Sequence, residues 1–404
     1  MAEERHLGVA IVIGVTGING NSICRKLLEQ GSWQVYGTGR RDRPDWLPTE
    51  VSYVQLDLLD QVDVQTKLSP LKNRITTLFW AAWIPMKTEE ENCDANGTIF
   101  RNTLDALLPG VLRHICLTTG AKHYLGPFDR WRDVMPAEAP FREDYPRLPV
   151  PNFYYVQEDL LFDRVKQHPH LTYSIHRPSA IFGFAPRSYM NCILALVVYA
   201  AICKRDKLPF RFFGSRATWE GLTCASDADL IAEQEIWAAT HPAAKNQALN
   251  ITNGDVFKWK HVWAVIADEM GVDPVPFDGE SFNLESLMKG RDGAWDALVR
   301  EHKLLPTKFQ DVGQFWFLDT MFERAVENLS NMNKSKELGF LGFRNSEKSV
   351  RHWIQATDNQ CWCLCFQKCP RKDSERRVSF SEGSFLNLGS DLERLHSETC
   401  FLKS

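Results

Sequence analysis

The chain has 404 residues, of which 44% are hydrophobic and 24% are charged, and its formal net charge is −4. This composition is typical of a globular protein with one large core or two domains. The small negative charge argues against a nucleic-acid-binding protein that works through bulk positive charge. Because the charged start, MAEERHLG, lacks the apolar segment of a signal peptide, we expect a cytoplasmic protein.

The longest apolar run, residues 190–203, is shorter than the roughly 18 residues that a membrane-spanning helix needs. We therefore expect no membrane span and interpret this run as a buried helix. The chain has 11 cysteines, and those between Cys24 and Cys224 have no metal-ligand spacing. This pattern is typical of a reduced protein, so we predict no metal site.

Short apolar segments alternate with helical segments over the first part of the chain. The predicted strands are residues 8–17, 33–40, 51–58, 75–83, 114–120 and 172–183. The predicted helices between them are residues 21–31, 89–108 and 151–162. Short buried strands separated by helices indicate a parallel, doubly wound sheet, so we predict an α/β fold of the Rossmann type.

The pattern changes after residue 184, where aromatic loops and a short strand near Phe210 appear among helical segments. The helix candidates are residues 194–204, 226–240 and 258–270. No linker rich in proline, glycine and serine separates this part from the sheet. We predict that residues 1–184 form mainly the dinucleotide-binding core. Residues 185–357 would complete that core and form a smaller, mostly helical cap that binds substrate.

A glycine-rich loop joins the first predicted strand to the first predicted helix. Its glycines, Gly14, Gly17 and Gly20, are spaced as GxxGxxG in the context that the dinucleotide fingerprint requires. Glycines let the backbone approach a pyrophosphate, and the helix that follows offers free N–H groups and its positive end. We therefore predict a dinucleotide site, with a tight turn that binds no ligand as the alternative.

The end of the second predicted strand indicates which dinucleotide binds. An NAD site has an acidic residue there for the ribose 2′-hydroxyl, but this chain has Arg40 and Arg41. Two arginines suit a 2′-phosphate through charge-assisted hydrogen bonds, which favours NADP(H) over NAD(H). A solvated basic loop is the alternative. Asp57, near the end of the third strand, is a candidate partner for the adenine amine or an ordinary buried turn carboxylate.

The helix predicted before the last strand begins with Tyr154 and Tyr155. A reductase of the short-chain type has a lysine four residues after its catalytic tyrosine, but Glu158 and Asp159 occupy these positions. Lys122 instead follows the fifth predicted strand, and ligands of open α/β sheets bind beyond the carboxyl ends of the strands. Lys122 is therefore a candidate partner for either tyrosine, with a surface lysine as the alternative.

Several longer motifs and their spacing resemble one family. They are GVTGINGNS, YGTGRR, EENCDANGTIFRN, KHYLGPF, NFYYVQEDLL, HRPSAIFGF, NGDVFKWK and MNKSKELGFLGFRNS. The chain resembles the progesterone 5β-reductase/iridoid synthase family, an atypical branch of the extended short-chain dehydrogenases/reductases, over roughly residues 7 to 357. The resemblance implies an NADPH-dependent ene-reductase with a Rossmann core and a helical cap. It implies reduction of the C=C bond of α,β-unsaturated carbonyls, as in steroid metabolism.

The resemblance also implies roles for single residues. It makes Lys122 and Tyr154 the catalytic pair, which decides between the two tyrosines. The expected cofactor-binding residues are Gly14, Thr16, Gly17, Ile18, Gly20, Arg40, Arg41, Asp57, Leu58, Ala82, Trp83, Thr118 and Ile181. The expected substrate-binding residues are Phe128, Tyr124, Met190 and Phe317, with Phe184 and Trp219 as further candidate walls. Ser179 is expected beside the cofactor; Ser179, Ile181 and Trp83 also have ordinary strand-end or core roles as alternatives.

In the expected reaction, a tyrosine hydroxyl stabilises the negative charge that develops on the carbonyl oxygen of an enone. A neighbouring ammonium would lower the pKa of the tyrosine or support that charge. Steroid enones, small enones and open-chain monoterpenals all suit an apolar cleft. The alternatives are a non-catalytic NADP(H)-binding sensor or scaffold and a carbonyl reductase or epimerase on the same fold. We also allow for a homodimer.

The last segment, residues 358–404, lies outside the resemblance. Cys361, Cys363, Cys365 and Cys369 are close together, but they lack the paired CxxC spacing of a structural zinc site. The segment is polar and rich in serine, so we expect a disordered extension with no part in catalysis. Acylation of the cysteines and phosphorylation at Ser379 are the alternatives.

Overall fold

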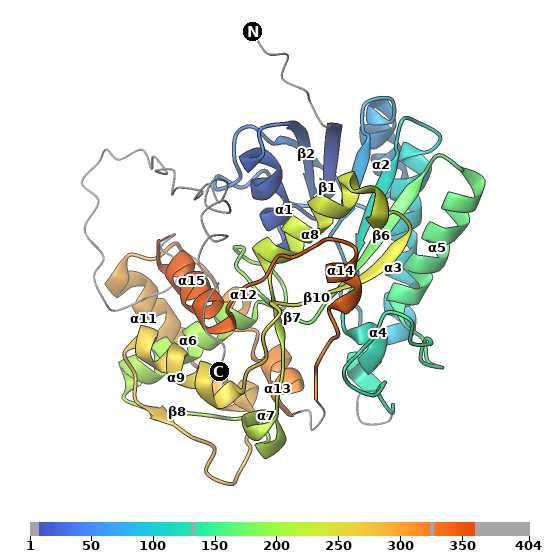
Figure 1. Ribbon diagram of the computed structural model, residues 1–404. Coiled ribbons are helices and arrows are strands. Elements are labelled where there is room, and N and C mark those ends of the chain that lie inside the picture. Colours follow the sequence, from blue (N-terminus) through green and yellow to red (C-terminus); the bar gives the residue numbers. More distant parts are fainter. Residues whose placement is uncertain (1–7, 131–133, 324–326, 360–404) are drawn as a thin grey trace, which may run out of the picture. The chain divides into compact units, whose positions relative to one another are not determined.

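The computed structural model describes residues 8–130, 134–323 and 327–359 (Figure 1). The close-set cysteines of the last segment lie outside the described residues, so the expectations for that segment stay predictions. All strands of the main sheet are parallel, in the order β10-β6-β5-β4-β1-β2-β3. These strands are β1 (Gly8–Ile13), β2 (Trp33–Gly39), β3 (Ser52–Gln55), β4 (Thr77–Trp80), β5 (His114–Thr118), β6 (Thr172–Pro178) and β10 (Gln247–Ile251).

Helices cover both faces of this sheet (Figure 1). On one face lie α1 (Ile18–Glu29) and α8 (Ala228–Thr240), which share a buried apolar cluster with β1 and β2. On the other face lie α2 (Gln61–Leu68), α3 (Glu89–Leu107) and α5 (Phe153–Gln167), which share a second cluster with the sheet. Burial of both faces explains why the central strands β1 and β4 are almost wholly apolar. The predicted Rossmann-type fold is confirmed.

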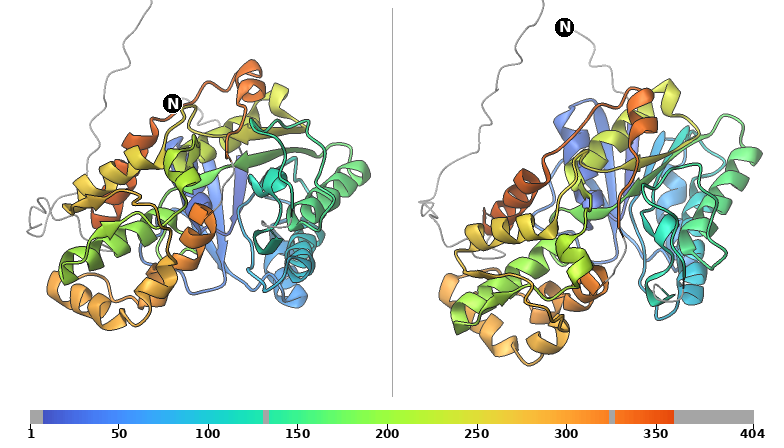
Figure 2. Two further views of the ribbon diagram at one scale, coloured as in Figure 1. Left: turned by 90° about the horizontal axis from the view of Figure 1, so that it is seen from below. Right: turned by 60° about the horizontal axis from the view of Figure 1, so that its bottom comes forward.

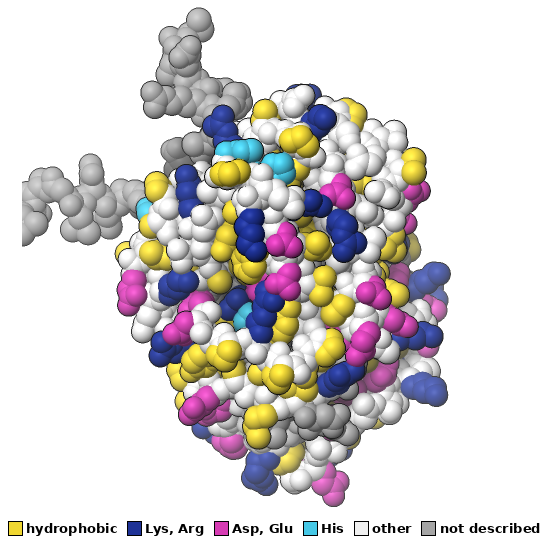
Figure 3. Space-filling model, turned by 90° about the vertical axis from the view of Figure 1, so that its right-hand side faces the viewer, with side chains coloured by type: hydrophobic (Ala, Val, Ile, Leu, Met, Phe, Trp, Pro, Cys, Tyr) yellow, Lys and Arg dark blue, Asp and Glu magenta, His cyan; other side chains and the backbone are white. Residues whose placement is uncertain are grey.

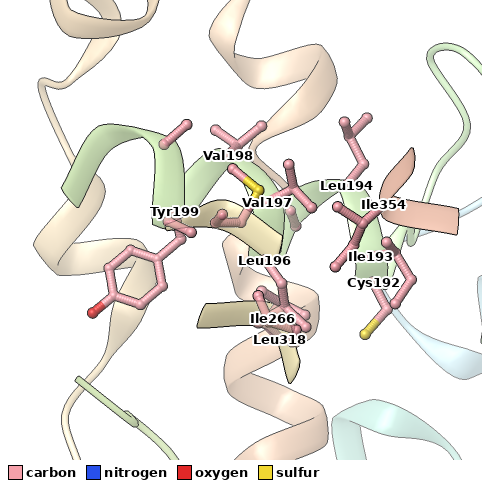
Figure 4. Close-up of a cluster of buried hydrophobic side chains, with 14 of the residues drawn as sticks. Cys192, Ile193, Leu194, Leu196, Val197, Val198, Tyr199, Ile266, Leu318 and Ile354 are labelled. Carbon is pink, nitrogen blue, oxygen red and sulfur yellow. The ribbon is translucent and has the colours of Figure 1, made fainter. Parts of the chain in front are cut away.

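A second group of helices packs around α6 (Cys192–Asp206), in which residues 192–203 are all buried. Its partners α9 (Trp259–Met270), α11 (Asp292–His302), α13 (Phe315–Glu323) and α15 (Ser346–Asn359) belong to the same apolar cluster. Ile266, Leu318 and Ile354 surround α6 in Figure 4. Because α6 is enclosed on all sides, its sequence is apolar all round, as predicted for a buried helix. Among the described residues, no helix is both long and apolar enough to cross a membrane.

The part after residue 184 contributes to both regions of the fold. β10 and α8 complete the sheet and its covering layer, whereas the helices around α6 form the second region. Figure 2 shows this helical region, in green, yellow and orange, gathered on one side of the sheet in both views. The remaining elements are α4 (Lys122–Leu125), α7 (Arg216–Glu220), α10 (Leu284–Met288), α12 (Phe309–Val312), α14 (Asn333–Glu337), β7 (Ala180–Phe182), β8 (Phe210–Arg211), β9 (Ala225–Asp227) and β11 (Pro274–Val275). Single turns of 3₁₀ helix are Ser69–Leu71, Phe128–Arg130 and Pro242–Ala244.

The strand predicted over residues 172–183 is in fact two strands. β6 ends at Pro178 in the main sheet, and β7 pairs with β9 in a separate small sheet. At the break between them, the backbone N–H of Ser179 donates to Ser226 Oγ at 2.9 Å. The chain therefore leaves the main sheet at Ser179, and it does so at the carboxyl end where a ligand would bind.

Charged side chains of both signs are interspersed on the face shown in Figure 3. Neither lysine and arginine nor aspartate and glutamate dominate that face. This distribution agrees with the small net charge of −4.

A carboxyl group is buried between α8 and the sheet. Glu235 Oε1 accepts hydrogen bonds from Asn19 Nδ2 at 3.0 Å and from Thr118 Oγ1 at 2.7 Å. Its other oxygen, Oε2, has no hydrogen-bond partner among the described residues. Burial raises the pKa of Glu235 to about 7, although the two donors oppose this rise. The folded protein therefore favours the protonated carboxyl group at this position.

This raised pKa predicts a dependence of stability on pH. An unfolded chain loses the Glu235 proton near pH 4, so the contribution of Glu235 to stability falls as pH rises from about 4 to about 7. The side chain of Glu235→Gln cannot ionise. The free energy of unfolding of this variant should therefore rise relative to that of the wild type by up to about 3 kcal/mol across that pH range. Thermal unfolding midpoints of both proteins between about pH 5 and about pH 8 test this expectation. A difference that does not change with pH would contradict it.

Candidate active site

A cavity of about 570 Å³ lies at the carboxyl ends of the central strands. Its lining includes the segments that follow β1, β4 and β5, next to the point where the strand order reverses. Dinucleotides bind at this point of a doubly wound sheet. The expected cofactor-binding residues that line the cavity are Gly14, Thr16, Gly17, Ile18, Arg40, Arg41, Asp57, Leu58, Ala82, Trp83, Thr118 and Ile181. Ser179 lines it as well.

The glycine loop forms a tight cradle between β1 and α1. Gly14 has φ of +88°, and a Cβ atom there would lie 2.9 Å from the carbonyl oxygen of Ala81. The N–H of Gly17 closes the turn by donating to the Gly14 carbonyl at 2.9 Å. Gly20 does not line the cavity, so its expected role as a cofactor contact stays a prediction. A Cβ atom on Gly20 would lie 2.2 Å from the Gly14 carbonyl oxygen, so this glycine lets α1 pack against the loop.

Arg40 and Arg41 follow β2 and line the same cavity with exposed side chains. Their backbone is held in place, because Gln55 Nε2 donates to the Arg40 carbonyl and Tyr53 Oη to the Arg41 carbonyl. Arg43, in contrast, binds three backbone carbonyls of its own loop. No described residue forms a salt bridge with Arg40 or Arg41, so both guanidinium groups can meet an anion in the cavity.

The two tyrosines at the start of α5 have different surroundings. Tyr154 lines the cavity, whereas the hydroxyl of Tyr155 donates to the His123 carbonyl at 2.7 Å and accepts from the Leu148 N–H at 3.1 Å. The Tyr154 hydroxyl lies beside the end of β5, since a Cβ atom on Gly120 would be 3.2 Å from it. Burial raises the pKa of the Tyr154 phenol. Tyr154 is therefore protonated at neutral pH and can donate a hydrogen bond into the cavity.

Lys122 begins α4 and lines the cavity too, with a side chain that is only 4% exposed. Its Nζ lies 2.6 Å from Glu89 Oε1, 4.0 Å from the centroid of the Phe153 ring and 5.3 Å from that of the Tyr154 ring. Asn152 joins the two segments: its Oδ1 accepts from the Tyr154 N–H, and its Nδ2 donates to the Lys122 carbonyl. The fold thus brings Lys122 and Tyr154 together at one cavity.

Glu158, which occupies the position of the missing lysine, belongs to a buried ion-pair network outside the cavity. Its carboxylate lies 3.1 Å from Arg177 Nη2, 3.0 Å from Arg147 Nη2 and 3.6 Å from His123 Nδ1. Burial raises the pKa of Glu158, but these three groups outweigh burial and hold it at about 2. Asp159 pairs with Arg147 at the surface. Glu158 is therefore ionised and neutralised away from the substrate.

Tyr124 belongs to the same network and does not line the cavity, so its expected role as a substrate contact stays a prediction. Its ring stacks on Phe141, and its hydroxyl donates to Asn250 Oδ1 at 2.7 Å and accepts from Arg177 Nη1 at 3.1 Å. Two other candidate walls also lie elsewhere: Phe184 is buried in the helical cluster, and Trp219 packs on Phe212. These three aromatic residues support the site from outside the cavity.

The apolar part of the cavity is lined by aromatic rings. Trp83 stacks on Phe153 with ring centroids 6.1 Å apart and meets Tyr189 edge-on at 5.6 Å. Phe128 and Phe317 meet edge-on at 6.4 Å, and both line the cavity, as does Met190. The sheet and the helical region therefore both contribute to this wall.

Several cavity residues were not foreseen. They are Phe153, Arg187, Tyr189 and Asn328, together with Glu89 as the partner of Lys122. Glu89 lies in the run TEEE, which reads as an ordinary acidic first turn of a helix. Arg187 has φ of 56°, and no motif in its loop would place this arginine at the site. These residues reach the cavity through tertiary structure.

Comparison with known proteins shows the family of the chain. Residues 52–361 match the family described as PRISE-like Rossmann-fold domain. The chain is 49% identical over 361 residues to an (S)-8-oxocitronellyl enol synthase of Nepeta racemosa, covering 87% of this chain and 92% of that protein. It is also 49% identical over 355 residues to a 3-oxo-Δ4,5-steroid 5β-reductase of Arabidopsis thaliana, covering 86% and 90%.

Solved structures share the fold at low sequence identity. A UDP-glucose 4-epimerase from Thermotoga maritima has a TM-score of 0.62 and 14% identity, with 87% of this chain and 99% of that chain covered. The corresponding enzyme of Thermus thermophilus has a TM-score of 0.60 and 14% identity, with 86% and 98% covered. The chain therefore belongs to the PRISE-like Rossmann-fold family, as its resemblance to the progesterone 5β-reductase/iridoid synthase family implied.

Proposed function

We propose that the protein is an NADPH-dependent reductase of the C=C bond of α,β-unsaturated carbonyl compounds. The observation that carries this proposal is that Lys122 and Tyr154 line one cavity together with the glycine cradle and the aromatic wall. The names of the two relatives support this substrate class, since one is a 5β-reductase of 3-oxo-Δ4,5-steroids and the other an (S)-8-oxocitronellyl enol synthase. Apolar enones and monoterpenals are the substrates that the aromatic wall suits.

The residues of the cavity fit NADPH. Gly14 and Gly17 leave room for a pyrophosphate beside the N-terminus of α1, where a side chain would collide with the backbone. Arg40 and Arg41 would hold the 2′-phosphate, and Asp57, which lines the same cavity, would bind the adenine amine. When bound, NADPH supplies the hydride that reduces the C=C bond. We assign the nicotinamide end of the cofactor site to Trp83, Thr118 and Ile181.

The side chains of the protein then bind and polarise the substrate. Tyr154 donates a hydrogen bond to the carbonyl oxygen, on which negative charge develops as the C=C bond is reduced. The Lys122 ammonium, 5.3 Å from the Tyr154 ring centroid, adds positive potential at this place. The aromatic wall excludes water from the apolar body of the substrate, and the α-carbon takes its proton from solvent.

The role of Tyr154 is tested by Tyr154→Phe. Removal of one donor to a developing oxyanion lowers kcat by about 10²- to 10³-fold. The dissociation constant of NADPH should stay nearly unchanged, because the phosphate-binding residues are untouched. Consumption of NADPH with 2-cyclohexen-1-one measures kcat, and fluorescence titration measures NADPH binding.

Tyr155→Phe is the matched control for this variant. It removes a neighbouring hydroxyl that is bonded only inside the protein, so it should lower the thermal unfolding midpoint and keep kcat within a few-fold. Equal losses of kcat in the two variants would count against the assignment of Tyr154. Binding of NADPH by the wild type without turnover of any enone would favour a sensor instead.

The choice of cofactor is tested by Arg40→Ala and Arg41→Ala. Each variant removes charge-assisted hydrogen bonds to the 2′-phosphate, which are worth about 1.5–3 kcal/mol. The ratio of kcat/KM for NADPH to that for NADH should therefore fall by about 10- to 100-fold per variant. Arg101→Ala, on the exposed side of α3, is the control and should leave the ratio unchanged. Unchanged ratios in all three variants would refute the 2′-phosphate site.

A further inference from the structure

The buried partner of Lys122 is the first residue of α3. Glu89 Oε1 lies 2.6 Å from Lys122 Nζ, and the two side chains are 2% and 4% exposed. An ion pair with so little contact with water is costly to bury, unless its geometry is good and further hydrogen bonds satisfy both groups. The Glu89 carboxylate must therefore have further hydrogen-bond partners.

Glu89 is fixed by the starts of two helices. The same Oε1 accepts from the backbone N–H of Phe153 at 2.8 Å, and Oε2 accepts from Asn92 Nδ2 at 3.3 Å. Phe153 is the first residue of α5, so its N–H has no partner within that helix. Glu89 also lies in the first turn of α3, where the helix dipole favours a negative charge. The carboxylate thus links α3, α4 and α5 at the point where they meet the cavity.

This arrangement determines where the ammonium of Lys122 lies. Its Nζ is held over the face of the Phe153 ring at 4.0 Å and lies 5.3 Å from the centroid of the Tyr154 ring. A buried ammonium without a counter-charge gives up its proton readily, whereas a neighbouring carboxylate keeps it charged. The same carboxylate opposes the ionisation of the nearby phenol, because burial and then Glu89 raise the pKa of Tyr154.

We propose that Glu89 is a positioning residue for the reaction: its carboxylate, which binds Lys122 Nζ and the Phe153 N–H, fixes the Lys122 ammonium beside Tyr154. Glu89 itself contacts neither substrate nor cofactor in this account. With this counter-charge beside the ammonium, the phenol of Tyr154 acts as a hydrogen-bond donor in the proposed reaction. The inference rests on the proposed function, because it assigns Glu89 to the same reaction.

Glu89→Gln removes the negative charge but keeps the shape of the side chain, because the amide oxygen can still accept hydrogen bonds from Phe153 and Lys122. We expect kcat to fall about tenfold near pH 7, and the basic limb of the kcat pH profile to move to lower pH. The dissociation constant of NADPH should change less than about twofold, because the phosphate-binding residues lie elsewhere. A residue with only a structural role would leave the pH profile in place.

Glu90→Gln is the matched control. Glu90 lies in the same first turn of α3 and pairs with Arg130 at the surface, so its change alters the helix terminus equally. Its pH profile and kcat should match those of the wild type. The inference is overturned if Glu89→Gln has the same basic limb as Glu90→Gln.

A double-mutant cycle shows whether Glu89 acts through Lys122. In the background of Lys122→Met, the further change Glu89→Gln should lower kcat less than about twofold, because the group that Glu89 positions is already gone. The double variant also carries no unpaired buried charge, so it remains testable if the single variant folds poorly. The inference is contradicted if Glu89→Gln lowers kcat as much in the Lys122→Met background as it does in the wild type.

A titration without substrate keeps this test independent of the proposed function. We expect one tyrosine of Glu89→Gln to ionise at lower pH than it does in the wild type. The ultraviolet absorbance of tyrosinate measures this ionisation. This signal should be absent when Tyr154→Phe is added. If the wild type reduces no enone, the proposed function fails, but the titration still decides the effect of Glu89 on Tyr154. Identical titration curves for wild type and Glu89→Gln would overturn that effect.

Discussion

The site depends on the burial of an ammonium group next to a phenol. Lys122 and Tyr154 come from different segments, and neither would hold this arrangement alone. Glu89 supplies the counter-charge, and Asn152 joins the two backbones by accepting from Tyr154 and donating to the Lys122 carbonyl. A lysine placed four residues after the tyrosine would be held by a single helix. Here three helix starts must come together, so the chemistry depends on tertiary structure.

The parallel sheet explains why these segments meet. The loops after β1, β4 and β5 emerge at one edge, and the reversal of strand order opens a space between them. Behind this edge lies a second layer of buried charge, in which Glu158, Arg177 and Arg147 neutralise one another. The hydroxyl group of Tyr124 is hydrogen-bonded within this layer, and that of Tyr155 is hydrogen-bonded to the backbone. The layer therefore supports the segment that carries Lys122, while the Tyr154 side chain lines the cavity.

The local sequence was sufficient to predict which residues lie at the cavity where these residues directly follow a strand. The glycine loop, Arg40, Arg41 and Lys122 could be placed because each directly follows a recognisable apolar strand. The choice of Tyr154 over Tyr155 came only from the resemblance to a family; in the structure Tyr154 lines the cavity, whereas the Tyr155 hydroxyl is bonded to the backbone. The direction of the Tyr124 side chain could not be predicted, because a residue of a short helix can face either side of it. Glu89 and Tyr189 were missed because their roles arise from contacts between distant segments.

In the proposed reaction the site directs reduction to the C=C bond and not to the carbonyl group. This selectivity is measured with NADPH that carries deuterium at the transferable position and with 2-cyclohexen-1-one as the substrate. We expect cyclohexanone that carries deuterium on the carbon β to the carbonyl. An allylic alcohol with deuterium on the former carbonyl carbon would contradict it.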